Sequence, residues 1–278
     1  MDQWIWKPAD MRSTPSRLVG IDCESENFLR GRAISWVIRI SLLNFLQLPQ
    51  LIIATASVYL HRFYMRKSVR RYSPKVMSAT ALFLATKAKE VPRKLEYIIR
   101  EYLRIKENGD EIQPGNLKPD NFEESASFKQ QILYFEGILL QTLCFDLAVD
   151  HPYTTLIQMV KNIHISHSRI RPIEKSLLID MADWTKAKSL AQASWGFLSN
   201  SLMTPLCVIH RPEVIAAAAF LIVAIHWVIK CSTDHQAASD PSLPLGLDKS
   251  WLRSEVYHHL NLPDILNDPA SEGSSKAQ

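Results

Sequence analysis

SATALFLATKAKEVPRKLEYIIR, residues 78–100, is the stretch that decides the fold. Its first half is apolar nearly all the way round, with alanines set between leucines and Phe83. A helix without a polar face belongs in the centre of a bundle, and alanine is a strong helix former that lets neighbouring helices approach. Lys87, Lys89 and Glu90 end the apolar run, and Pro92 stops the helix. The stretch therefore predicts a buried central helix that carries charged side chains to the surface.

Composition extends this prediction to the whole chain. The 278 residues are 47% hydrophobic, which is enough for two domains with sizeable cores. Only 8 residues are glycine, and strand-like alternation is rare, so we expect an all-α protein. The four cysteines include no C-x-x-C pair, which argues against a disulfide framework or a zinc site and suits a reducing compartment. A net charge of +4 is too small to indicate binding to nucleic acid or a membrane by itself.

A second alanine-rich run echoes the first. Residues 217–222, AAAFLI, follow a proline as residues 79–84, ATALFL, do. The run around them, 214–229, is shorter than the roughly 20 residues of a membrane helix and contains His226, so it reads as a buried core helix. Each half is therefore predicted to be a bundle of about five helices around one alanine-rich helix.

Breaks in the helical pattern suggest the domain boundaries. We expect an N-terminal arm over 1–27, a first bundle over 28–148, a second over 149–262 and a disordered tail over 263–278. Trp4 and Trp6 are expected to pack the arm against the body. The chain after Leu260 is short and contains Pro263, so the last helix of the second bundle is expected to be truncated or absent.

One carboxylate stands out in the helix expected over 125–144. Glu136 falls in the row formed by Ile132, Leu139 and Leu143. A carboxylate in an apolar stripe is costly unless it is paired. Alternatively, Phe135 and Ile138 mark the core and Glu136 only flanks it, and the pattern alone does not decide between these readings.

Motifs for catalysis are missing from the sequence. It contains no G-x-G-x-x-G, Walker loop, G-x-S-x-G or H-E-x-x-H. We therefore expect no catalytic residue, no cofactor and no metal site. The basic residues between His61 and Tyr72 have the composition of a weak nucleic-acid patch, but an exposed helix end accounts for them better, so direct nucleic-acid binding is not expected.

Three long segments, together with the arm, resemble the cyclins, and in particular the transcriptional cyclins of the cyclin K and cyclin T type. They are IATASVYLHRFYM (53–65), ALFLATKAKEVPRKLEYIIR (81–100) and EGILLQTLCFDLAVDHP (136–152), and the arm segment WIWKPADMRSTPSRLVGID (4–22) adds to them. The second half matches more weakly. The resemblance implies two tandem cyclin boxes and a regulatory subunit without catalysis, which binds a cyclin-dependent kinase.

The resemblance also implies a binding site. In the family, a lysine at the end of the third helix and a glutamate in the fifth contact the kinase, and these positions fall on Lys87 and Glu136. Glu90 and Phe145 match further contact positions, and Arg32 resembles a first-helix arginine that braces the box. One departure is Lys89, which stands where the family usually has an acidic residue and which puts the choice of partner in doubt.

Transcriptional cyclins activate kinases that phosphorylate the C-terminal domain of RNA polymerase II. The resemblance therefore implies a nuclear protein that reaches this substrate through its kinase, with ATP and Mg²⁺ bound by the kinase and no membrane association. Two alternatives are a DNA-binding protein with the fold of a general transcription factor and a scaffold that does not activate a kinase.

Overall fold

The computed structural model describes residues 2–42, 46–108, 122–169 and 184–234, in which helices are joined by turns and short loops. No strand occurs within these ranges, so the all-α prediction is confirmed there. The chain divides into two units. The first comprises Met1–His151 and Asn200–Arg211, and the second comprises Pro152–Ser199 and Pro212–Gln278.

The first unit begins with short helical segments and continues with five longer helices. The short segments are η1 (Asp2–Trp4), η2 (Asp10–Arg12) and α1 (Pro15–Leu18). The longer helices are α2 (Cys23–Leu42), α3 (Gln50–Arg66), α4 (Pro74–Ala88), α5 (Leu95–Asn108) and α6 (Phe122–Thr142). Another short helix, η4 (Pro205–Val208), comes from the later part of the chain and packs against α3.

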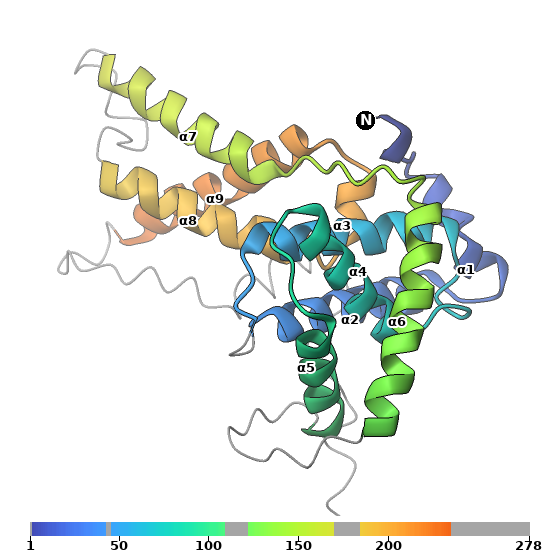
Figure 1. The fold of residues 1–278 in the computed structure, drawn as a ribbon. Helices are drawn as coiled ribbons and strands as arrows, with labels where there is room; N and C mark the ends of the chain where they lie inside the picture. Colours follow the sequence, from blue (N-terminus) through green and yellow to red (C-terminus); the bar gives the residue numbers. More distant parts are fainter. Residues whose placement is uncertain (1, 43–45, 109–121, 170–183, 235–278) are drawn as a thin grey trace, which may run out of the picture. The chain divides into compact units, whose positions relative to one another are not determined.

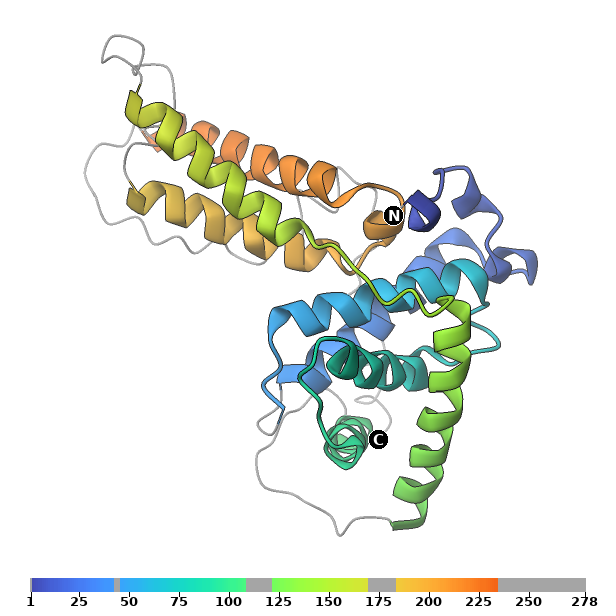
Figure 2. The ribbon, with the colours of Figure 1, turned by 45° about the horizontal axis from the view of Figure 1, so that its top comes forward.

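Helix α4 is the centre of this unit, as the opening stretch predicts. It contacts α2, α3, α5 and α6, which lie around it in Figures 1 and 2. Every side chain from Met77 to Thr86 is buried. Helix α3 is just as deeply buried, from Ile52 to Met65. Its polar residues are buried because they find partners inside the unit.

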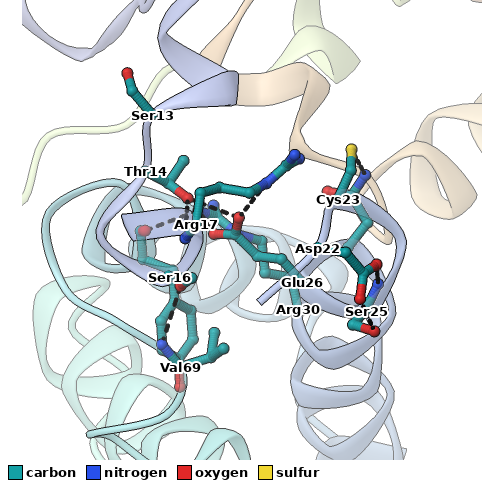
Figure 3. A network of polar contacts seen from close by, with 12 residues as sticks. Ser13, Thr14, Ser16, Arg17, Asp22, Cys23, Ser25, Glu26, Arg30 and Val69 are labelled. Atoms are coloured by element: carbon teal, nitrogen blue, oxygen red, sulfur yellow. Dashed lines mark hydrogen bonds and ion pairs between the residues drawn. The ribbon is translucent and has the colours of Figure 1, made fainter. Parts of the chain in front are cut away.

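The arm belongs to the first unit, and side-chain contacts anchor it there. Thr14 Oγ1 donates to Glu26 Oε2 at 2.7 Å, and Arg17 Nε lies 3.1 Å from the same oxygen. Ser16 Oγ accepts from the backbone N–H of Val69 at 3.2 Å. Figure 3 shows these side chains converging between α1 and α2. Helix α2 begins at Cys23, inside the segment 1–27 that the sequence assigned to the arm.

In the second unit, the structure describes α7 (Pro152–Arg169), α8 (Trp184–Ser201) and α9 (Pro212–Asp234). Helix α7 packs along α9, and the ring of Tyr153 of α7 lies against Trp195 of α8, with ring centroids 4.3 Å apart and the planes tilted by 33°. The chain after Leu260, where the last helix was expected to be truncated or absent, and the tail over 263–278 lie outside the described residues.

Two expectations for the second half need correction. Helix α9 buries Ile215, Ala219 and Val223, but Leu221 is 58% exposed and Ile225 50% exposed, so its described part is not surrounded as α4 is. The segment 200–211, which the sequence placed in a second bundle over 149–262, groups with the first unit. The first unit runs to His151, past the expected boundary at 148.

Candidate functional site

The lysine and glutamate singled out in the sequence meet in the structure. Lys87 Nζ, in the last turn of α4, lies 2.7 Å from Glu136 Oε1 and 2.9 Å from Glu136 Oε2, in the middle of α6. Glu136 lies in the buried row with Ile132 and Leu139, whereas Phe135 and Ile138 are only half-buried. The reading that placed Glu136 in the apolar stripe is therefore confirmed.

The two partners differ in their access to solvent. The Glu136 side chain is 11% exposed and the Lys87 side chain is 45% exposed. Lys87 Nζ also lies 4.1 Å from the centre of the Phe83 ring, an attractive cation–π position. The Glu136 carboxylate therefore lies at the edge of the core, and the Lys87 amine lies over it at the surface. Its contacts with Glu136 and with the Phe83 ring fix the position of the amine.

Glu90 lies where α4 turns out of its helical path. The N–H of Val91 donates to Thr86 O at 3.0 Å, and the N–H of Glu90 donates to Lys87 O at 3.1 Å. This is the Schellman pattern, which satisfies the last carbonyls of a helix. Glu90 occupies its left-handed position with φ 57°, where glycine is usual and another residue costs about 1 kcal/mol or more. The helix thus ends at this turn, before Pro92 is reached.

Helix α6 ends in the same way. The N–H of Phe145 donates to Leu140 O and the N–H of Cys144 to Gln141 O, both at 3.0 Å. Cys144 has φ 53° and Phe145 φ 57°, so two successive residues without a glycine are left-handed. The Phe145 side chain is 69% exposed. A strained turn therefore presents a large aromatic side chain to solvent, an arrangement that is found at functional sites.

Arg32 is not the brace of the first helix, and this expectation is corrected. Its side chain is half-buried and lies over the Phe28 ring of its own helix, with the guanidinium carbon 5.7 Å from the ring centre. Arg30 has the bracing geometry instead. It is 1% exposed and donates to Glu26 Oε1 at 2.7 Å, and to Tyr64 O at 2.7 Å and His61 O at 3.3 Å of α3.

The buried brace depends on a fully satisfied carboxylate. Figure 3 shows Thr14, Arg17 and Arg30 directed at Glu26. Burial alone would raise the pKa of Glu26, but the charge of Arg30 and the hydrogen bond from Thr14 outweigh it, so the pKa lies below its ordinary value of 4.5. The sequence carried a signal for this pair, because Glu26 and Arg30 are four residues apart on one helix.

Neither a metal site nor a membrane span is found where the structure describes the chain. No group of three or more histidine, cysteine, aspartate and glutamate side chains in the described ranges is placed to hold a metal ion. No described helix combines the length and apolar character needed to cross a bilayer.

Comparison with known proteins points to one family. The sequence profile described as "Cyclin, N-terminal domain" matches residues 9–148, which contain all of the site residues discussed above. Cyclin pch1 of Schizosaccharomyces pombe is 31% identical over 265 residues, covering 95% of this chain and 68% of that protein. Human cyclin-K is 31% identical over 219 residues, covering 79% of this chain but only 33% of that protein.

Solved structures share the fold at lower identity. A chain of the yeast RNA Pol II CTD kinase CTDK-1 complex aligns with a TM-score of 0.60 at 14% identity, over 94% of this chain and 68% of that one. A chain of the CAK complex from Chaetomium thermophilum bound to ATP-gamma-S aligns with a TM-score of 0.55 at 20% identity, over 85% and 70% of the two chains. Both likenesses concern the helical fold.

Proposed function

This chain belongs to the cyclin family, and we propose that it is the non-catalytic regulatory subunit of a cyclin-dependent kinase that phosphorylates the C-terminal domain of RNA polymerase II. The observation that carries the proposal is the Lys87–Glu136 pair, which joins the last turn of α4 to α6 at the surface of the first unit. Glu90 and Phe145 lie at the ends of the same two helices, on left-handed turns.

The geometry suits a surface that holds another polypeptide. The ammonium group of Lys87 has three N–H donors, and the two oxygens of Glu136 accept two of them, so a third donor remains for a carbonyl group of the kinase. Each carboxylate oxygen has further lone pairs for backbone N–H groups. Because the two charges already neutralise each other, the kinase can cover them without burying an unpaired ion.

Activation would follow from this contact. A cyclin pressed against the kinase αC helix holds it inward and orders the activation loop, so that the kinase's own Lys–Glu pair and metal-binding Asp align on ATP. This chain supplies the last turn of α4 and the C-terminal part of α6 to that contact. ATP and Mg²⁺ belong to the kinase, and we expect the chain to need no cofactor and to reside in the nucleus with its partner.

The proposal is tested by purifying the tagged chain from its own cells and identifying the proteins bound to it. We expect one cyclin-dependent kinase in stoichiometric amount, and we expect the complex to phosphorylate a peptide of RNA polymerase II heptad repeats faster than the kinase alone. A kinase that binds but is not activated would instead indicate a scaffold. DNA binding that weakens steeply with salt, without a bound kinase, would favour the transcription-factor alternative.

A further inference from the structure

The segment 142–148, which we call the Phe145 turn, is held by more contacts than a helix end requires. It contains the last residue of α6 and the two left-handed residues Cys144 and Phe145. Left-handed residues other than glycine persist only when the surrounding structure holds them in place. The contacts that do so come from two directions, namely helix α3 and the N-terminal arm.

From α3, three side chains donate hydrogen bonds to carbonyl groups of the Phe145 turn. Arg66 Nη1 donates to Thr142 O at 2.9 Å and Arg62 Nη1 to Ala148 O at 3.1 Å. Tyr59 Oη donates to Leu147 O at 2.8 Å. These bonds satisfy carbonyls that have no partner within a helix and fix the turn at both of its ends.

From the arm, Trp4 contacts both arginines and the turn itself. Its indole Nε1 donates to Asp146 Oδ2 at 2.8 Å, and Gln3 Nε2 donates to the same oxygen at 2.6 Å. The guanidinium carbons of Arg66 and Arg62 lie 4.4 and 4.8 Å from the centre of the Trp4 ring. Trp4 therefore orders the two arginines and also binds the turn directly.

Burial separates Trp4 from any role in direct contact with a partner. Trp4 is 3% exposed, whereas Phe145 is 69% exposed. A change at Trp4 can therefore reach a bound protein only through the residues that it holds. The exposed aromatic side chain lies one residue away from Asp146, the acceptor of the Trp4 hydrogen bond.

We propose that the arm is a latch in which Trp4 is a positioning residue that holds the Phe145 turn in its left-handed form and thereby sets the affinity for the kinase. The inference rests on the proposed function, because it takes the kinase as the protein that receives Phe145. With the latch closed, Phe145 meets its partner already ordered. Without it, the turn relaxes, and binding has to order the turn again, which weakens the complex.

The test is a double-mutant cycle on the full chain with its kinase. We expect Trp4→Ala to weaken kinase binding about tenfold in the natural background, but less than about twofold when Phe145→Ala is already present. Hydrogen exchange at the amides of 142–148 should rise in Trp4→Ala while the amides of α4 keep their protection. Trp4→Phe keeps the ring under the arginines and should restore part of the affinity.

Trp6→Ala serves as the matched control. Trp6 lies in the same arm beside Trp4, with ring centroids 5.9 Å apart, but it is tied through its backbone N–H to Val208 O. We expect this variant to bind the kinase within about twofold of the natural chain. Should Trp4→Ala fail to fold, Arg66→Met removes the bond to Thr142 O from a solvent-exposed position and replaces it in the cycle.

Equal losses from Trp4→Ala in both backgrounds, or no loss in the natural one, would overturn the latch. An unchanged kinase affinity in Phe145→Ala would also overturn the latch, because the turn would then position no side chain that the kinase binds. None of these results depends on the Lys87–Glu136 pair. The proposed function therefore stands or falls separately, on whether a kinase binds and on the effect of substitutions at Lys87.

Discussion

Replacing Lys87 by alanine is the sharpest test of the proposed kinase contact. In the free chain, the Glu136 carboxylate lies at the edge of the core and the Lys87 side chain is 45% exposed. Because solvent reaches the pair, it contributes about 1 kcal/mol or less to stability. In the complex, the kinase would cover the unpaired Glu136 carboxylate, and removing one partner of a buried pair costs about 3–5 kcal/mol. The difference, about 2–4 kcal/mol, corresponds to a loss of affinity of about thirtyfold to a thousandfold.

Isothermal titration of the purified kinase into natural and variant chains measures this loss. Lys129 on α6 provides the control, because its distance of 2.6 Å to Glu96 is similar to that in the Lys87–Glu136 pair. In the control pair, however, the carboxylate is exposed as well, since Lys129 is 46% and Glu96 59% exposed. We expect Lys129→Ala to change affinity less than about threefold. Adding Glu136→Gln to Lys87→Ala should recover part of the loss, because a neutral amide is easier to bury than a charge. An affinity for Lys87→Ala equal to that of the control would refute the assignment.

Three further predictions concern the stability of the chain alone, measured by urea unfolding. Arg30→Met leaves Glu26 buried without its main partner and should lower the free energy of unfolding by about 3–5 kcal/mol, whereas a loss below about 1 kcal/mol would argue against the brace. Gly137 lies inside α6 with nothing near the position of an added Cβ, so Gly137→Ala should raise stability by about 0.5–1 kcal/mol, and a decrease would contradict this reading. Burial holds the pKa of His61 at about 3 and that of His151 at about 4, below the 6.5 of an unfolded histidine. The unfolded state therefore binds more protons, and lowering the pH from about 7 to about 5.5 should reduce stability by about 1 kcal/mol per histidine, an effect that His61→Asn should halve.

Much of the first unit follows from local sequence pattern. The apolar run around Phe83 predicts the buried centre because no polar face is left for solvent, and burial from Met77 to Thr86 confirms it. Pattern reasoning also found Glu136, because a carboxylate in an apolar row needs a partner. It could not choose between the two readings of that helix, since the partner, Lys87, is 49 positions away in the chain.

The contacts that escaped prediction are those in which polar atoms meet backbone carbonyls from other helices. Arg30 braces α3 through the backbone carbonyls of His61 and Tyr64. Every residue has a backbone carbonyl, so the sequence of α3 does not indicate which of them will accept a hydrogen bond. The assignment therefore fell on Arg32, two positions along the same helix. The turn at Cys144 was equally hidden, because left-handed backbone is usually marked by glycine and none is present there.

The return of residues 200–211 to the first unit makes that unit discontinuous in the chain. Leu202 O accepts the Nε2 proton of the buried His61, and Val208 O accepts the N–H of Trp6. A fragment cut at His151 would keep both donors and lose both acceptors, along with the side chains that cover them. The first unit therefore consists of two segments of the chain, separated by the insertion Pro152–Ser199. A fragment designed to fold as this unit should keep both segments and shorten the insertion between them.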